Sequence, residues 1–269
     1  MPQAVIESPN DERVRIYRHL PKRKACRSRP HFVVEGRWLV HRLVDSGLAV
    51  ESILCGQSQS EEFAALCPNI PLYIARTAVL KQIVGFEFHR GVLACGLRPE
   101  SHDLEDVVAS AGRTSLIAAC SGVRDQENLG SVIRNCRAFG ADALLLDSQC
   151  ADAFSRRVMR VSAGAALELP VVESDDLWRD VFRLQSESGF TFVATVLDNQ
   201  AIALEEFNVK DKMVVAFGSE GYGLDHEALQ LSDYHVTLPM CNGIDSVNIG
   251  VASGIFLHHF SHQQRVCSR

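Results

Sequence analysis

The stretch LPMCNGIDSVNIGVASGIFLHHF, residues 238–260, restricts the fold of this chain more than any other. An apolar strand runs into a polar loop that contains Gly243, and Ser246 and Asn248 then open a helix that is almost wholly apolar. The start of a helix offers unpaired backbone N–H groups and a partial positive charge. Glycine in turn lets a loop approach a ligand closely. The stretch therefore predicts a ligand-binding loop between a strand and a helix.

Two segments upstream have the same character, DQENLGSVIRNCRAFG at 125–140 and MVVAFGSEGYGL at 213–224. Each places polar side chains where a short apolar run ends. In sheets of parallel strands, ligands bind beyond the carboxyl ends of the strands. Three such loops in one domain predict one composite site.

The residues around these loops alternate between apolar strand patterns and helical patterns. Strict alternation predicts an α/β fold with a mostly parallel sheet that is covered on both faces. The expected strands are 114–122, 141–147, 167–173, 190–198, 212–218 and 234–240, and the expected helices are 128–140, 154–166, 175–189, 225–232 and 246–262.

A shorter alternation between residues 31 and 98 predicts a small α/β domain ahead of the larger one. Its expected strands are 32–36, 50–55, 71–75 and 90–98, and its expected helices are 37–48, 61–67 and 77–85. Charged residues and helix breakers then indicate a linker around a short helix. We therefore expect domains at 1–98 and 114–269, joined by a linker at 99–113.

The chain has 269 residues, of which 46% are apolar, and a formal net charge of −6. This composition supports a packed core and excludes a globally basic nucleic-acid coat, but it does not exclude a local basic patch. Eight arginines and lysines fall within the first 29 residues, Arg23 and Lys24 among them. Such a segment either contacts nucleic acid or forms a solvated, partly disordered tail.

Nine cysteines are scattered along the chain without a CxxC pair. Several lie inside apolar runs, such as Cys95 and Cys120, where cysteine acts as a small hydrophobic residue. Neither a disulfide framework nor a zinc site is expected. The N-terminus lacks an apolar signal core and no stretch reaches ~18 uncharged apolar residues. We therefore expect a soluble protein of the reducing cytoplasm with no membrane partner.

The glycines of GSEGYGL, at 218, 221 and 223, match neither the GxGxxG pattern nor a P-loop, which needs a lysine. A standard dinucleotide site is therefore disfavoured. Arg134 is either an ordinary surface arginine or a group that reaches the strand-end cleft. Asn248 either caps its helix or touches a ligand. Glu220 stands between two glycines, where a carboxylate has no packing role.

Taken together, three motifs resemble those of the SpoU–TrmH family, S-adenosylmethionine-dependent RNA ribose 2′-O-methyltransferases of the SPOUT superfamily. They are N-x-G-x-x-x-R at 128–134, G-S-E-G-x-G-L at 218–224 and P-M-x-x-G-x-x-S-V-N at 239–248. The resemblance covers 114–262 in order and spacing. The segment 32–55 also looks like the substrate-binding domain that many members place ahead of the catalytic one. Departures are small: DQENLG stands where Pro or Gly often precedes the Asn, and Val247 stands where Leu is common.

The resemblance implies a trefoil-knotted SPOUT methyltransferase domain preceded by a small L30e-like RNA-binding domain. Pattern reasoning would not propose a knot, because knots are nearly absent from proteins. The resemblance also implies a homodimer with the last helix and the motif-one helix at the interface. The small residues Gly250, Ala252, Ser253 and Gly254 would allow close helix packing, either across that interface or within one subunit.

In this family an arginine that matches Arg134 is assigned to the ribose 2′-hydroxyl, sometimes as general base. Because arginine stays charged in proteins, we favour electrostatic stabilisation of the developing alkoxide and the adjacent phosphate, with proton abstraction left open. The expected catalytic residues are Arg134, Asn128, Glu220, Ser246 and Asn248. The expected S-adenosylmethionine-binding residues are Thr195, Leu197, Gly218, Leu238, Met240 and Val247. The expected RNA-binding residues are Arg23, Lys24, Arg156, Arg157 and Arg160, and no metal is expected.

Ribosomal RNA is preferred over transfer RNA as the substrate because of the extra N-terminal domain. A SPOUT base methyltransferase is an alternative that needs an aspartate near the motif-three helix, for which Asp245 is the nearby candidate, and the pair Asn128 and Arg134 argues against it. A tRNA 2′-O-methyltransferase also stays open. An inactive RNA-binding or ribosome-assembly protein is disfavoured because all three motifs keep their polar residues.

Overall fold

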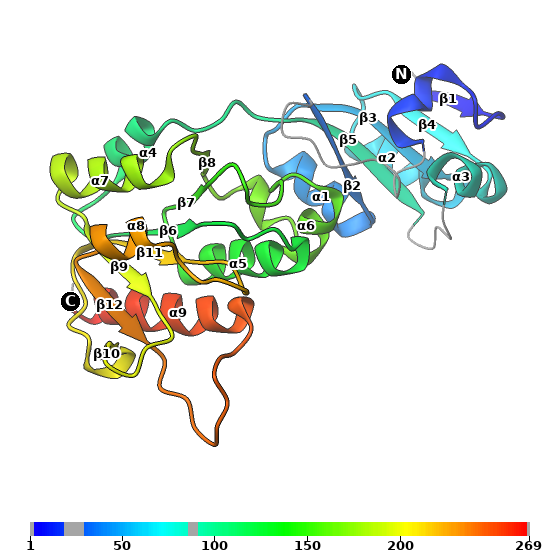
Figure 1. Ribbon diagram of the computed structural model, residues 1–269. Coiled ribbons are helices and arrows are strands. Elements are labelled where there is room, and N and C mark those ends of the chain that lie inside the picture. Colours follow the sequence, from blue (N-terminus) through cyan, green and yellow to red (C-terminus); the bar gives the residue numbers. More distant parts are fainter. Residues whose placement is uncertain (1–2, 19–29, 86–90, 268–269) are drawn as a thin grey trace. The chain divides into compact units, whose positions relative to one another are not determined.

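The computed structural model describes residues 3–18, 30–85 and 91–267, which form two compact units (Figure 1). Unit 1 comprises Met1–Glu100 together with Phe154–Leu167, and unit 2 comprises Ser101–Ala153 together with Glu168–Arg269. The chain therefore enters unit 2, returns to unit 1 for one short segment, and then completes unit 2.

Unit 1 is built on a mixed five-stranded sheet in the order β1-β4-β3-β5-β2. The strands β1, β4 and β3 run parallel, and β5 pairs antiparallel with both β3 and β2. Its strands are β1 Gln3–Ile6, β2 His31–Glu35, β3 Val50–Gly56, β4 Leu72–Ala75 and β5 Val92–Leu97. Its helices are η1 Glu12–Tyr17, α1 Arg37–Asp45, η3 Gln57–Gln59, α2 Ser60–Leu66, α3 Thr77–Val84, α6 Arg156–Val161 and η4 Ala165–Leu167. The elements expected between residues 31 and 98 are all present.

The start of the chain is ordered rather than a solvated tail over residues 3–18. Gln3–Ile6 adds a strand to the edge of the sheet, parallel to β4. Val14 and Tyr17 are fully buried in the same hydrophobic cluster as Ile6. Burial of these apolar side chains outweighs the polar and charged residues between them, so the tail interpretation was wrong for this stretch. The rest of the basic cluster, from residue 19 to residue 29, lies outside the described residues.

Unit 2 is built on a seven-stranded, fully parallel sheet in the order β10-β12-β9-β11-β6-β7-β8. The expectation of a mostly parallel α/β sheet is therefore confirmed. Its strands are β6 Ser115–Cys120, β7 Ala143–Leu146, β8 Val171–Glu173, β9 Thr191–Thr195, β10 Ile202–Ala203, β11 Lys212–Phe217 and β12 Tyr234–Thr237. Its helices are α4 Leu104–Ser110, α5 Gln126–Phe139, α7 Leu177–Ser188, η5 Leu204–Glu206, α8 His226–Leu231 and α9 Ile249–Cys267.

Helices cover both faces of this sheet, as buried central strands require. One face packs on α4, α7 and α8 in a single hydrophobic cluster that includes Val107, Trp178 and Ala228. The other face lies against α5 and α9, which run side by side (Figure 1). On that side Phe256 of α9 packs edge-on to Phe217, with ring centroids 6.1 Å apart.

Two segments lie elsewhere than the sequence led us to expect. The basic helix at 154–166 was assigned to the second domain, but the structure groups it with unit 1, where Phe154 packs against Phe32 with ring centroids 5.1 Å apart. The short helix of the expected linker, α4, buries Leu104 in the core of unit 2. In both cases an apolar side chain of the segment is buried in the unit that holds it.

No helix within the described residues is both long and apolar enough to cross a membrane.

Candidate active site

A cavity of 670 Å³ lies at the carboxyl ends of β9, β11 and β12 in unit 2. It is formed by the residues after β9, the glycine loop after β11, and the loop that leads from β12 into α9. Its lining includes all six residues expected to bind the methyl donor, namely Thr195, Leu197, Gly218, Leu238, Met240 and Val247. Glu220, Ser246 and Asn248 line it as well. Loops that are distant in sequence thus meet at one strand-end edge.

The first turn of α5 is held by a side-chain cap. Asp125 accepts hydrogen bonds from the backbone N–H groups of Glu127 and Asn128, both at 2.9 Å, which satisfies donors that a helix start leaves unpaired. The helix ends at Gly140, whose φ of 79° is left-handed, as in a glycine C-cap. Asn128 is therefore fixed on the first turn of a well-terminated helix.

A chain of hydrogen bonds joins the three motifs at the cavity rim. The amide nitrogen of Asn128 donates to Glu220, and the amide oxygen of Asn128 accepts from the amide nitrogen of Asn248 at 2.9 Å. The amide oxygen of Asn248 accepts from the backbone N–H of Gly250 at 2.8 Å. Each motif supplies one member of the chain, so the network exists only in the folded domain.

The direction of every bond in this chain follows from its one fixed donor. A backbone N–H can only donate, so the amide oxygen of Asn248 must face Gly250. The amide nitrogen of Asn248 then faces the oxygen of Asn128, whose own amide nitrogen is left to donate to Glu220. Glu220 must therefore accept this hydrogen bond through a carboxyl oxygen.

The glycine loop has a tight internal geometry. Ser219 and Gly223 exchange backbone hydrogen bonds of 3.2 and 2.9 Å. A Cβ on Gly218 would lie 2.1 Å from the carbonyl carbon of Gly223, whereas a Cβ on Gly221 would meet nothing within 4 Å. Glycine is thus required at 218 by close backbone approach, and the resulting turn carries Glu220 on its exposed side.

Apolar side chains stand exposed around the same cavity. Leu197 is 71% exposed, Tyr222 is 97% exposed and Val247 is 37% exposed. Exposed apolar surface that gathers at a concave site is typical of a ligand-binding site. The lining combines such side chains with backbone polar groups, a set that suits an aromatic base and a ribose.

The asparagine at the start of α9 has the capping role expected of it, and contact with a ligand stays a prediction. The structure begins this helix at Ile249, three residues later than the pattern indicated, and Asn248 caps it through the bond to the N–H of Gly250. Asn248 also lines the cavity.

The described motifs match a known family. The SpoU rRNA Methylase family model matches residues 115–258. The chain belongs to the SpoU rRNA Methylase family.

Several proteins of known name or structure are similar to this family member. An uncharacterized tRNA/rRNA methyltransferase of Mycobacterium bovis is 37% identical over 69% of this chain, and the match spans 64% of that relative's length. The 23S rRNA (guanosine(2553)-2′-O)-methyltransferase RlmP of Bacillus subtilis is 28% identical over 94% of this chain and 98% of its own. The AdoMet-bound rRNA methyltransferase of Sinorhizobium meliloti has a TM-score of 0.85 at 23% identity, covering 98% of this chain and 99% of its own.

Three of the residues considered for chemistry in this SpoU chain do not line the cavity, namely Asn128, which joins the rim through its bond to Asn248, Arg134 and Asp245. Arg134 lies on an exposed position of α5, outside the cavity lining. Asp245, the residue on which a base methyltransferase would depend, is also exposed and absent from the lining. The structure brings four of the five expected catalytic residues together at the rim and leaves Arg134 on the neighbouring helix surface.

Three of the residues expected to bind RNA belong to unit 1, whereas the cavity belongs to unit 2. Arg156, Arg157 and Arg160 belong to α6 in unit 1. Arg156 forms an ion pair with Glu35, which is 5% exposed, so its charge already serves a structural contact. Arg23 and Lys24 lie outside the described residues.

Sequence reasoning overlooked Asn135, which holds α9 against α5. Its amide nitrogen donates to the carbonyl of Gly250 at 2.6 Å and to the hydroxyl of Ser253 at 3.0 Å. The available signal was the spacing of Asn128, Ser131 and Asn135, which puts three polar side chains on one face of the helix. Gly250, Ser253 and Gly254 of α9 meet that face within one subunit, whereas Ala252 lines the cavity.

Cysteine chemistry is suppressed where thiols are buried. Burial raises the pKa of the Cys136 thiol, in the last turn of α5, to about 12, and raises that of Cys120, at the end of β6, well above its usual range. Among the described residues no three His, Cys, Asp or Glu side chains gather as a metal site.

Proposed function

We propose that this protein transfers a methyl group from S-adenosylmethionine to a ribose 2′-hydroxyl of RNA. The observation that carries the proposal is the rim of the cavity, where Glu220, Asn128 and Asn248 join all three family motifs in one directed hydrogen-bond network. The network borders a cavity large enough for a nucleoside-sized ligand, and family membership supplies the reaction class.

The cavity fits the methyl donor in size and in the kinds of groups that line it. Its volume of 670 Å³ falls within the range of about 300–1,000 Å³ for small-ligand sites. Leu197, Leu238 and Val247 would cover the faces of an adenine, while backbone groups beside Gly218 would meet the ribose. When bound, S-adenosylmethionine supplies an electrophilic methyl group on a positively charged sulfur.

The residues of this chain then have to position the ribose and handle charge. Asn128 and Asn248 hold the rim in one arrangement, because each amide is already committed to a partner. Glu220 places a negative charge next to the site. We assign Arg134 to the ribose hydroxyl and the adjacent phosphate, where a permanent positive charge stabilises a developing alkoxide. Preorganised groups of this kind lower a barrier because they do not reorganise during the reaction.

Ribosomal RNA is the substrate that we favour over transfer RNA. The matching family is described as an rRNA methylase family, and the Bacillus subtilis relative that aligns over nearly its whole length is named for 23S rRNA. Unit 1, which carries its own sheet, is the part that we assign to RNA recognition as an L30e-like domain. An RNA substrate also fits the cytoplasmic location expected from the sequence.

A trefoil knot and a homodimer complete the proposal. The chain passes from β11 to β12 across β9, since β11 and β12 lie on opposite sides of that strand, and such a crossing is compatible with a knotted return. The exposed residues Val251, Ile255, His258 and His262 follow one another at helical spacing on α9. We assign this stripe to contact with a second copy of the chain.

The test is methyl transfer from labelled S-adenosylmethionine to total RNA, followed by nucleoside analysis. Wild type is compared with Arg134→Ala and with Arg137→Ala, a control on the same helix whose side chain forms an ion pair with Glu168 at 2.9 Å. We expect the label in RNA of ribosomal size and, after digestion, in a 2′-O-methylnucleoside. The label should be lost in Arg134→Ala and kept in Arg137→Ala.

Other outcomes redirect the assignment. Label in a base would support the base methyltransferase, and label in RNA of transfer size would change the substrate. Binding of S-adenosylmethionine without any transfer, both to protein-free RNA and to assembling ribosomal particles, would overturn the proposed activity.

A further inference from the structure

We propose that a second cavity, in unit 1, binds one unpaired nucleotide of a single-stranded RNA segment, with its base stacked on Trp38 and its phosphate held by Arg160. The proposal rests on RNA as the substrate of the proposed function and adds a recognition site in the unit that does not contain the methyl-transfer cavity. It is carried by an exposed aromatic ring, a local excess of arginines and a pocket of matching size.

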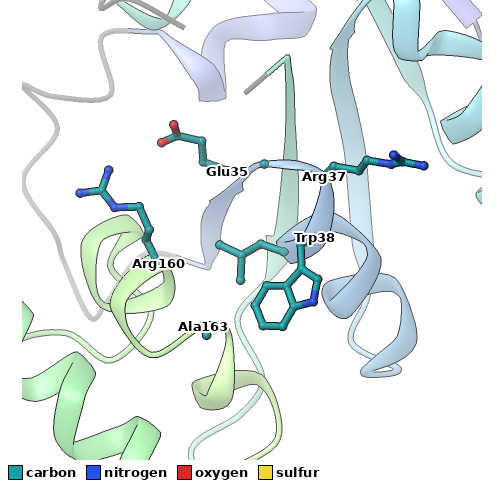
Figure 2. A pocket seen from close by; sticks show the side chains of 7 residues that line it. Glu35, Arg37, Trp38, Arg160 and Ala163 are labelled. Atoms are coloured by element: carbon teal, nitrogen blue, oxygen red, sulfur yellow. The ribbon is translucent and has the colours of Figure 1, made fainter. Parts of the chain in front are cut away.

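The cavity has a volume of 330 Å³ and lies between α1 and α6. This size is at the low end of about 300–1,000 Å³ for small-ligand sites, so it admits one nucleotide and not a duplex. Its lining consists of Glu35, Gly36, Arg37, Trp38, Leu39, Arg160 and Ala163. Figure 2 shows the indole of Trp38 directed toward Ala163, and Arg160 and Glu35 on the opposite side of the space.

Trp38 is unusual for its exposure. Its side chain is 56% exposed, whereas the other tryptophan, Trp178, is 7% exposed and stacks on Phe192 in the core of unit 2. Large aromatic side chains are normally highly buried. An indole that lines a cavity and stays open to solvent offers a flat surface on which a base can stack, since every base has a π-face.

The indole is held in place by a neighbouring arginine. The guanidinium of Arg42 lies 5.1 Å from the ring centroid of Trp38. Arg42 also donates a hydrogen bond of 2.6 Å to the backbone carbonyl of Ala163, in the segment that follows α6. The cation–π contact and the backbone bond together fix the ring before a ligand arrives, which reduces the entropy lost on binding.

The charges around the cavity favour an anion. Glu35 is the carboxylate of the lining, and Arg156 already forms an ion pair with it. Arg37 extends away from the cavity in Figure 2, and its Nε donates to Glu62 at 2.6 Å. Arg42, Arg156 and Arg160 together outnumber Glu35, so a phosphate beside Arg160 meets a net positive field.

An unpaired base is the chemistry that fits. In an RNA duplex the bases are stacked on one another and their faces are inaccessible, so a side chain can stack only on bases of loops, bulges and single strands. Aromatic stacking with backbone contacts by arginine is the general mode of single-strand binding. The site therefore reads the shape of the RNA and contributes to substrate choice.

Tryptophan fluorescence tests the stacking directly. The full-length protein is titrated with a short single-stranded oligo(A), and with the same strand paired to oligo(U). Trp178 is buried and remote from solvent, so quenching that is present in wild type and lost in Trp38→Phe reports on Trp38 alone. We expect quenching by the single strand and little by the duplex.

Affinity measurements with the same probe separate stacking from folding. Trp38→Ala and Arg160→Gln should each weaken binding about ten-fold, in line with the worth of one stacked base, while Trp38→Phe, which keeps a ring, should weaken it less than Trp38→Ala. Phe182→Ala and Arg113→Gln, exposed aromatic and arginine positions in unit 2, should bind as wild type. Thermal unfolding confirms that each variant is folded.

Two results together overturn the proposal. They are no quenching of Trp38 fluorescence in the wild-type protein and wild-type affinity for the single strand in folded Trp38→Ala. This failure differs from failure of the proposed function, because methyl transfer is measured separately. If both hold, Trp38→Ala raises the KM for RNA and leaves kcat and the affinity for S-adenosylmethionine unchanged. Quenching without any methyl transfer would support the nucleotide site and count against the activity.

Discussion

Asn248 donates a hydrogen bond to the amide oxygen of Asn128 over 2.9 Å, although the two residues are 120 positions apart in sequence. This single contact joins the start of α9 to the start of α5, and the amide nitrogen of Asn128 in turn donates a hydrogen bond to Glu220. The rim of the proposed methyl-transfer site therefore forms only in the folded domain. A hydrogen-bond donor and its acceptor in the rim can be exchanged by a pair of substitutions.

The donor–acceptor order of this network predicts a reciprocal rescue. Asn128→Asp replaces the amide that donates to Glu220 with a carboxylate, so two negative groups face each other and methyl transfer should fall at least about ten-fold. In the double variant Asn128→Asp with Glu220→Gln, the new amide can donate to the new carboxylate, and part of the rate should return. The measurement is kcat/KM with labelled S-adenosylmethionine. A double variant no faster than the single one would count against the network.

The glycine loop predicts opposite results at two neighbouring glycines. Gly218→Ala places a Cβ 2.1 Å from the backbone of Gly223, and an overpacked backbone of this kind costs roughly 1–3 kcal/mol. We expect at least about ten-fold weaker binding of S-adenosylmethionine, measured by calorimetry. Gly221→Ala meets open space and should bind as wild type. Equal affinities in the two variants would show that the loop does not shape the cavity.

The packing of α5 against α9 predicts a clash that a second substitution relieves. A Cβ on Gly250 would lie 2.7 Å from the Cβ of Ser131, so Gly250→Ala should lower the free energy of unfolding by about 1–3 kcal/mol. Adding Ser131→Gly should recover most of the loss due to the clash. Gly254→Ala, whose nearest contact is Asn135 at 3.2 Å, should be nearly neutral. Urea unfolding checks all three, and a Gly250→Ala protein as stable as wild type would contradict the packing.

The phenol of Tyr17 predicts a stability effect in unit 1. Its hydroxyl is fully buried and donates to the carbonyl of Ser52 at 2.9 Å. Tyr17→Phe leaves that carbonyl without this donor, which should cost about 1–3 kcal/mol, while Tyr222→Phe, at a 97% exposed position, should change nothing. Thermal unfolding of the two variants provides the comparison.

The same phenol has a pH dependence of defined sign. Burial raises the pKa of Tyr17 well above its usual range, so the folded state keeps the proton that the unfolded state releases. The contribution is complete below the unfolded pKa of about 10 and declines as the pH rises beyond it. Tyr17→Phe should therefore flatten the loss of stability above about pH 10, and an unchanged slope would contradict this assignment.

Sequence patterns predicted most helices and strands, and they predicted the residues that line the cavity. The alternation of strands and helices predicted both sheets, because side-chain periodicity is a local property. Residues that follow three of the strands, such as Leu197 after β9, Gly218 after β11 and Val247 after β12, line one cavity because parallel strands deliver their carboxyl ends to one edge. The order of the strands was not predictable in this way, since nothing local states which strand pairs with which.

The remaining differences come from contacts over long sequence distances. The strand at Gln3–Ile6 is too short to be recognised from its pattern, and it is paired with β4 in the structure. Phe154 reads as part of the second domain by position, yet it packs on Phe32 in unit 1. Asn135 looks like an ordinary helix residue until α9 lies beside it.

The sequence by itself determined the type of each principal element, the family and the polar residues of the three motifs, since all of these depend on local spacing and residue chemistry. Only the tertiary structure decided that Glu220, Asn128 and Asn248 form one directed network, that α6 belongs to unit 1 and that Trp38 lines a cavity with Arg160. These relationships join residues about one hundred positions apart, and hydrophobic burial and hydrogen bonding act on proximity in space rather than on order in the chain.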